Sequence, residues 1–96
     1  MNKFSEIPNE DLEDISHRAR LASVGPWIAF VEGRDHHSGD SFIRIGDPES
    51  DMYVTKSQTG LPSLPVSAED LDFIAHARQD VPRLLDEVRR LRALIR

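Results

Sequence analysis

Residues 26–45 of the chain read PWIAFVEGRDHHSGDSFIRI, two short apolar runs separated by ten mostly polar residues. Apolar runs of four to six residues that contain aromatic and β-branched side chains are typical of β-strands. We therefore predict one strand over residues 27–32 and a second over residues 42–45. Both faces of the first run are apolar, which predicts a strand that is central in its sheet or covered on two sides.

A third strand is predicted over residues 52–55. The segment before it, residues 46–51, contains the glycine, proline, serine and aspartate that favour turns. Because the connections between these strands are local in sequence, an antiparallel meander is the simplest topology. Residues 56–66 contain two prolines and a glycine, and this composition predicts an extended linker.

The N-terminal part of the chain is predicted to form a helix over residues 9–24. Asn9 is a favourable N-cap residue, and the acidic side chains after it suit the positive end of the helix dipole. Apolar residues recur at helical spacing and form one stripe. Gly25 followed by Pro26 is expected to end the helix.

Two helices are predicted in the C-terminal third. Ser67 and Asp70 fit a variant capping box with Asp in the place of Glu, and Val66 can pack on Leu71 as a hydrophobic staple. This signal predicts a helix over residues 68–78. Asp80 and Pro82 are then expected to start a third helix, because proline is tolerated in the first turn.

The third helix carries an apolar stripe with alternating spacings of three and four, which matches two heptads of a and d positions. One interpretation is that the stripe packs on the sheet. The other is that the last turns extend past the body of the protein and pair with another subunit. The stripe consists of Val81, Leu84, Val88, Leu91 and Ile95.

Together these elements predict an α+β fold, in which a small antiparallel three-stranded meander packs against an N-terminal helix and two C-terminal helices. The 96 residues are expected to form a single domain, 1–96, with a flexible N-terminus at residues 1–8. A domain of this size has little room for a deep private pocket, so a ligand site would form more easily between subunits.

Charge and composition narrow the range of functions. The net charge is −5, with fourteen acidic and six basic residues in 1–77 and three acidic and six basic residues in 78–96. An acidic body argues against binding to duplex nucleic acid. The chain has no cysteine, which excludes disulfides and thiolate metal sites. With no apolar run of membrane-spanning length and no secretory signal, we expect a cytoplasmic protein.

The loop over residues 32–41, EGRDHHSGDS, is longer and richer in functional groups than a hairpin requires. Its glycines would let backbone N–H groups converge on an anion, its arginine would grip a phosphate or carboxylate, and its serine and histidine would add donors. Arg44 on the second strand, and Arg78 with Gln79 between the last two helices, could reach the same site. The alternative is that these are simply good loop residues. The expected ligand-binding residues in the loop are Gly33, Arg34, Asp35, His36, Ser38 and Gly39.

Metal binding and catalysis have weaker signals in this sequence. His36 and His37 are adjacent and would point apart in an extended backbone, and no H-x-H, H-x-x-x-H or H-E-x-x-H pattern occurs. Serine, histidine and aspartate occur together in the loop, but there is no G-x-S-x-G elbow. We therefore expect a protein without enzymatic activity, catalytic residues, metal site or cofactor.

Protein recognition is the remaining candidate. Five of the six aromatic residues are Trp27, Phe30, Phe42, Tyr53 and Phe73, and they are too many for one small core. An acidic surface with aromatic side chains at its centre suits a basic protein partner, such as a nuclease toxin.

The stretches PWIAFVEGRDHHSGDSFIRIG and AEDLDFIAHARQDVPRLLDEVRRLR resemble a family of small proteins scattered through bacterial and phage genomes. The shared elements are a W-x-x-F-V-E-G-R-D-H-x-S-G loop and a D-F-I-A-x-A-R-Q-D-V-P-R-L segment near the C-terminus. The match covers Gly25 to about Leu91 and leaves out the variable middle.

The resemblance implies a setting of conflict between phage and host, where two non-enzymatic roles are common. The first expectation is a homo-oligomer that sequesters a small anionic, nucleotide-derived ligand, as an anti-defence sponge for a signal would. The alternative is an immunity or inhibitor protein that neutralises a toxin by protein–protein binding. No membrane association is expected for either role.

Overall fold

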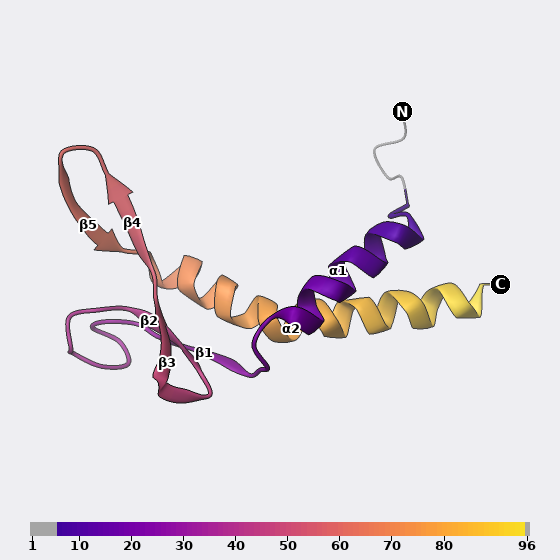
Figure 1. Cartoon of the computed structure of the whole chain (residues 1–96), viewed down its shortest axis with the longest axis horizontal. Coiled ribbons are helices and arrows are strands. Elements are labelled where there is room, and N and C mark those ends of the chain that lie inside the picture. The colour runs from indigo at the N-terminus through magenta and orange to yellow at the C-terminus, as the bar shows by residue number, and fades with distance from the viewer. Residues whose placement is uncertain (1–5, 96) are drawn as a thin grey trace.

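The computed structural model describes residues 6–95 and has an α+β fold. A three-stranded antiparallel sheet lies at one end of the molecule, and a long helix runs from it to the other end. The N-terminal helix crosses this long helix near its middle (Figure 1). This confirms the predicted fold class and the meander. The elements are α1 (Asn9–Leu21), β1 (Trp27–Phe30), β2 (Phe42–Ile45), β3 (Asp47–Tyr53), β4 (Thr55–Gln58), β5 (Leu61–Pro65) and α2 (Ala68–Leu94).

The N-terminal helix begins where the sequence predicts, but its cap differs. Asn9 is the first helical residue, and Pro8 occupies the N-cap position with no side-chain hydrogen bond to the first turn among the described residues. The predicted role of Asn9 as the N-cap is therefore wrong. The amides of Asp11 and Leu12 donate to the carbonyl oxygen of Pro8 at 3.0 and 3.1 Å. Of the predicted flexible segment, residues 1–5 lie outside the described part, and residues 6–8 have no regular structure.

The sheet has the strand order β1-β2-β3, so β1 is an edge strand and the predicted central position is wrong. Trp27 pairs with Ile45 and Phe30 pairs with Phe42 in the antiparallel register of β1 and β2. Trp27, Ala29 and Val31 face the helix α2, as their alternation along the strand requires. The opposite face of β1 is apolar although no helix covers it, and the side chain of Ile28 there is 51% exposed.

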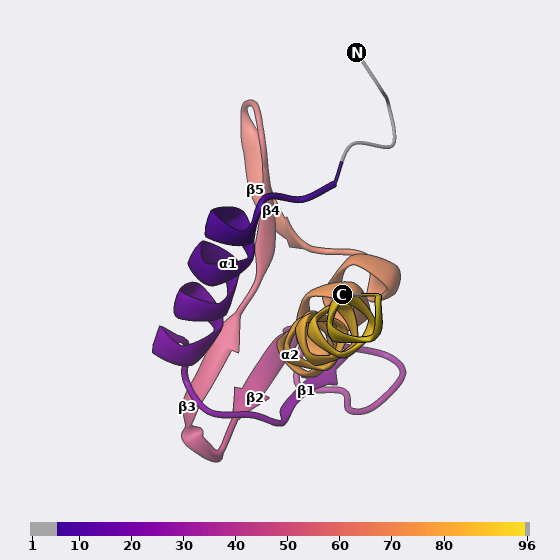
Figure 2. The same cartoon turned by 90° about the vertical axis from the view of Figure 1, so that its right-hand side faces the viewer.

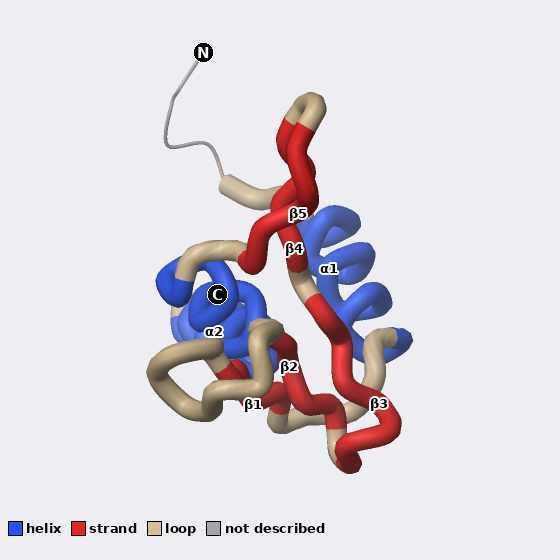
Figure 3. Tube along the Cα trace, turned by 90° about the vertical axis from the view of Figure 1, so that its left-hand side faces the viewer, coloured by secondary structure: helices blue, strands red, loops and turns tan. Residues whose placement is uncertain are grey.

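The segment 46–66 contains more strand than its composition predicts. A tight connection at Gly46 leads directly into β3, so most of the predicted turn over residues 46–51 belongs to a strand. The predicted linker over residues 56–66 is a hairpin of β4 and β5, in which the turn contains Gly60 at φ +72°. This hairpin projects from the end of β3 as a separate ribbon (Figure 3). The side chain of Gln58 donates to the carbonyl oxygen of Pro62 at 2.6 Å across the hairpin.

The C-terminal third forms one helix instead of two. Ser67 is the N-cap, and its hydroxyl accepts the amide of Asp70 at 3.1 Å, which confirms the predicted start. The predicted break at Asp80 and Pro82 is wrong, because α2 continues through Pro82 to Leu94. Pro82 is partly buried and lines two hollows together with residues of α1, and it lacks the N–H that an interior helical position would donate.

The hydrophobic core lies between the sheet and the first half of α2. Ile43 and Leu71 are fully buried, and Val31 and Ala75 complete the cluster. A smaller contact joins α1 to the second half of α2, where Leu12, Ser16 and Leu85 are buried. Figure 2, which views α2 along its axis, shows the sheet and α1 on different sides of this helix.

The molecule is elongated, because the second half of α2 extends beyond the sheet. Its principal extents are 52 × 34 × 22 Å and its radius of gyration is 17.2 Å. A compact chain of this length has a radius of gyration of about 12.5 Å. The shape therefore exposes side surfaces of α2 that a compact fold would bury.

Candidate functional site

The loop after β1 is closed by hydrogen bonds of its own residues. The amides of Arg34 and Asp35 donate to the carbonyl oxygen of Val31 at 3.1 and 2.9 Å, and the amide of Gly33 donates to His36 at 2.8 Å. In return, the carboxylate of Asp35 accepts the amide of Val31 at 2.7 Å. Reciprocal bonds of this kind fix a turn in the manner of an Asx turn.

The second half of the loop folds back on the carboxylate of Glu32. The amide of Gly39 donates to this carboxylate, and Gly39 has a φ of +105°, which favours glycine. The buried hydroxyl of Ser41 accepts the amide of Glu32 at 3.1 Å. Within this fold the amide of Gly39 therefore meets a carboxylate of the loop itself, while the amide of Gly33 meets the carbonyl oxygen of His36.

His36 and Ser38 are also engaged within the loop. Nδ1 of His36 accepts the backbone amide of Ser38 at 3.1 Å and lies 2.8 Å from its hydroxyl. The imidazole packs on Phe42 with 5.1 Å between ring centroids. His36 thus joins the loop to the sheet, while the side chain of His37 is largely exposed.

Arg34 ties the loop to α2. Its two terminal nitrogens bind the carboxylate of Asp72 at 2.8 and 3.0 Å, and its Nε binds Asp35 at 3.1 Å. Bidentate contacts of this geometry are among the stronger charge-assisted hydrogen bonds. The hydrogen bond from Arg34 lowers the pKa of Asp72. The pKa of Asp35 is lowered most by its hydrogen bond from the same guanidinium, and next by the hydrogen bond from the amide of Val31.

These ion pairs predict a pH dependence of stability. The pKa values of Asp35 and Asp72 in the folded protein lie below the ordinary value of 3.8. The stability that these ion pairs add is therefore fully present above pH 3.8, and it is lost as the pH falls through the folded pKa values. We expect Arg34→Ala to lower the melting temperature at pH 7 and to have a smaller effect as the pH falls from 3.8 through the folded pKa values. Thermal unfolding of both proteins at pH 7 and about pH 2 measures this.

The matched control for this prediction is Arg83→Ala, which removes an exposed guanidinium from α2. It should leave the melting temperature nearly unchanged at both pH values. If Arg34→Ala and the unsubstituted chain have the same melting temperature at pH 7, the ion pair between Arg34 of the loop and Asp72 of α2 does not form.

The remaining expected site residues lie on different parts of the fold. Arg44 is on the sheet face turned away from α2 and binds Asp51 at 2.9 and 3.0 Å. Arg78 donates to the carbonyl oxygen of Ser23 at 2.8 Å. Gln79 accepts the amide of Trp27 at 2.8 Å and donates to its carbonyl oxygen at 3.3 Å. Arg78 and Gln79 thus join α2 to the chain before and at the start of β1.

The sheet face opposite α2 carries a row of aromatic rings that sequence reasoning did not assemble. Phe30, Phe42 and Tyr53 are cross-strand neighbours, with ring centroids 5.2 and 5.3 Å apart. The guanidinium of Arg44 lies over Phe30 and Phe42 at 5.0 and 5.4 Å from their centroids. The alternation of residues along β1 and β2 already places Phe30 and Phe42 on one face of the sheet. The position of Tyr53 beside Phe42 depends on the register of β3, which alternation does not give.

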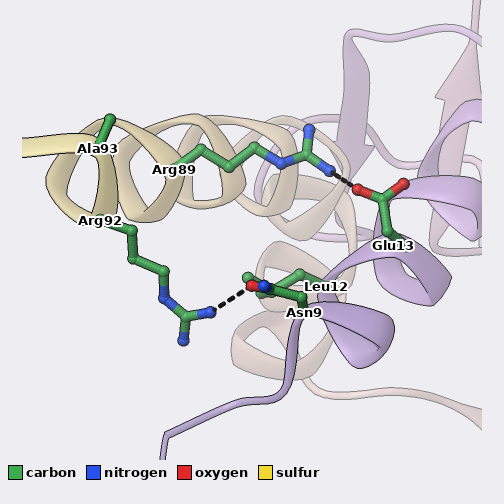
Figure 4. Close-up of a pocket in the computed structure, with 6 residues that line it drawn as sticks. All are labelled: Asn9, Leu12, Glu13, Arg89, Arg92 and Ala93. Carbon is green, nitrogen blue, oxygen red and sulfur yellow. Dashed lines mark hydrogen bonds and ion pairs between the residues drawn. The ribbon is translucent and has the colours of Figure 1, made fainter. Parts of the chain in front are cut away.

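Hollows in the surface also lie along the two helices. One of about 260 Å³ lies where α1 and α2 diverge, and it is bridged by Arg89 to Glu13 at 2.9 Å and by Arg92 to Asn9 at 3.0 Å (Figure 4). Another, of about 330 Å³, is lined on one side by Ile74, Ala77 and Val81 of α2. The second hollow is almost entirely apolar, which suits a protein side chain better than a charged ligand.

Within residues 6–95, no three histidine, aspartate or glutamate side chains gather closely enough to hold a metal ion. In the same part of the chain, no helix combines the length and the apolar character needed to cross a bilayer. Comparison of the chain with protein-family models, curated proteins and solved structures gives no match.

Proposed function

We propose that the chain is a non-enzymatic binding protein that uses the outer face of its sheet to hold a basic protein partner in the cytoplasm. The observation that carries this proposal is the aromatic row of Phe30, Phe42 and Tyr53 on a face that neither helix covers. Tyr53 is 59% exposed at one end of the row and Ile28 on β1 is 51% exposed, whereas Phe42 in the middle of the row is buried against Phe30, His36 and Tyr53. An exposed tyrosine on a rigid sheet is a usual anchor of protein interfaces.

The charge around this face suits a basic partner. Residues 26–66, which form the sheet and its hairpin, contain six acidic and three basic residues. Two of the three basic residues are already paired, Arg34 with Asp72 and Arg44 with Asp51. Such a surface attracts a positively charged protein and accelerates its association at low salt.

The resolved pKa shifts suit ion pairing. Within the described residues, each resolved shift stabilises the charged form, lowering carboxyl pKa values and raising arginine pKa values. A carboxyl group that acts as a general acid at neutral pH needs the opposite shift of its pKa. These groups suit ion pairs better than proton transfer.

Sequestration of a small nucleotide-derived anion is the competing proposal. The groups expected to grip the anion are bound within the protein, and a phosphate would have to displace Asp72 from Arg34 or Glu32 from the amide of Gly39. Displacement exchanges one charge-assisted hydrogen bond for another, so the net gain in binding free energy is small. This geometry favours the protein partner, which requires no such exchange.

The experiment is co-expression of the chain with each basic protein encoded beside it, followed by affinity capture. We expect one of these proteins to be captured, and Tyr53→Ala to weaken its binding by roughly tenfold or more, as loss of an exposed aromatic anchor does. Leu61→Ala is the matched control, because Leu61 is 64% exposed and lies on the hairpin away from the aromatic row.

A thermal-shift assay with ADP-ribose and cyclic nucleotides separates the two proposals. We expect no nucleotide to raise the melting temperature. A large shift that is lost in Arg34→Ala and retained in Tyr53→Ala would overturn the protein-binding proposal in favour of ligand sequestration.

A further inference from the structure

The continuity of α2 through Pro82 creates an apolar stripe that is longer than the sequence alone predicts. Apolar residues occur at alternating spacings of three and four over three heptads, from the sheet to the end of the helix. The four larger exposed members include Leu84 at 62% and Ile95 at 83% exposure. The stripe consists of Ile74, Ala77, Val81, Leu84, Val88, Leu91 and Ile95.

Neither of the surfaces that α2 contacts in its own chain uses most of this stripe. Leu71 and Ala75 face the sheet, and Leu85 is buried against α1. Leu84 and Leu91 lie about a quarter to a third of a turn away from Leu85 around the helix. The stripe therefore forms a third side of α2, and its first three members, Ile74, Ala77 and Val81, line the apolar hollow that Ile15 and Ala19 of α1 line on the other side.

We propose that a second copy of the chain binds along this stripe to form a parallel, two-stranded coiled coil of α2 helices. The a positions are Ile74, Val81, Val88 and Ile95, and the d positions are Ala77, Leu84 and Leu91. β-Branched residues at a together with leucine at d favour two parallel strands over higher oligomers. Apart from Ala77, each position of the seam follows this rule.

Charges beside the seam select the same orientation. Glu87 is a g position and Arg92 is an e position, and a parallel pair sets Glu87 of one copy beside Arg92 of the second. In an antiparallel pair the g positions of the two helices face each other, so Glu87 of one copy would lie near Asp80 or Glu87 of the second. Like charges at these positions are unfavourable, so complementarity excludes the antiparallel arrangement. Within the isolated chain Glu87 pairs with Arg90 at 2.6 Å on the exposed helix surface, a contact weak enough to exchange.

The position of the seam leaves the outer sheet face free. The sheet lies at one end of the molecule and the last turns of α2 at the other (Figure 1). A parallel pair would carry its two sheets at the same end. The dimer does not depend on the proposed protein partner, but it would present two copies of the aromatic row and increase the avidity for a multivalent one.

Analytical ultracentrifugation of the full chain at micromolar concentration tests the proposal. We expect a mass of twice the 10.9 kDa of one chain. Leu84→Asp and Leu91→Asp should each sediment as monomers, with the far-ultraviolet circular dichroism of a folded protein. Leu61→Asp, at an equally exposed leucine of the hairpin, should remain a dimer. A monomeric unsubstituted chain, or a dimer that survives both stripe substitutions, would overturn the inference.

Orientation is tested with single cysteines, because the chain has none of its own. Ile74→Cys and Leu91→Cys should each form a disulfide-linked dimer when oxidised alone, since parallel helices bring identical positions together. In an antiparallel pair these positions are about 25 Å from their own counterparts. Cross-linking only after the two variants are mixed would contradict the parallel arrangement.

Discussion

Replacing Leu71 by alanine should lower the free energy of unfolding by about 3 kcal/mol. The side chain of Leu71 is fully buried between the sheet and α2, where it contacts Val31, Ile43 and Ala75. The cavity left by the substitution has few neighbours able to move into it, because the core between the sheet and α2 is one small cluster. A domain of this size has a total stability of about 5 to 14 kcal/mol, so the variant would lose a large part of it.

Urea unfolding followed by the fluorescence of Trp27, which packs against the same cluster, measures the loss. Leu61→Ala is the matched control, since Leu61 is exposed on the hairpin and its truncation should change stability by less than about 0.5 kcal/mol. Equal effects of the two substitutions would mean that α2 does not pack on the sheet through Leu71.

Pro82→Ala should have the opposite sign and raise the free energy of unfolding by about 1 to 2 kcal/mol. Pro82 lies inside α2 and cannot donate to the carbonyl oxygen of Arg78, and an interior proline costs a helix about 3 kcal/mol. Two effects reduce the gain. Alanine frees the unfolded chain that proline restrains, by up to about 1 kcal/mol, and it removes most of a partly buried ring.

Urea unfolding of Pro82→Ala is compared with that of Arg83→Ala. The comparison isolates the effect of proline on the helix backbone, because the control alters only an exposed side chain of the same helix. It should change stability by less than about 0.5 kcal/mol. If Pro82→Ala destabilised the protein instead, the helix would have to end before Pro82, as the sequence alone predicts.

The local rules of sequence interpretation succeed where one short signal decides the structure. The capping box at Ser67 sets the start of α2. They fail where a local signal is ambiguous or where the whole fold outweighs local preference. Both faces of β1 are apolar, so the sequence does not say which face packs on α2. Pro82 is a reasonable helix start by propensity, but the structure has one continuous helix. The segment 55–65 contains prolines that argue against a sheet interior, yet they fit the edge positions of an isolated hairpin.

In the candidate site, too, local signals are visible in the sequence and long-range contacts are not. The composition of the loop predicts contacts with negative charge, but composition does not say that the carboxylates of Glu32 and Asp72 belong to the chain itself. Asp72 lies 38 residues from Arg34, and only the packing of α2 on the sheet brings them together. The aromatic row likewise depends on the register that places Tyr53 beside Phe42. Both features are long-range, and periodicity within one element does not reveal them.

The central claim is that recognition takes place on the outer face of the sheet. Chemical-shift mapping of the amides of the labelled chain, titrated with the basic protein that it captures, tests this most directly. We predict that the largest shifts occur on β1, β2 and β3, around Ile28, Arg44 and Tyr53, while residues 33–39 and the stripe of α2 change little. Shifts centred on Gly33 to Gly39, with the strands unaffected, would contradict the claim.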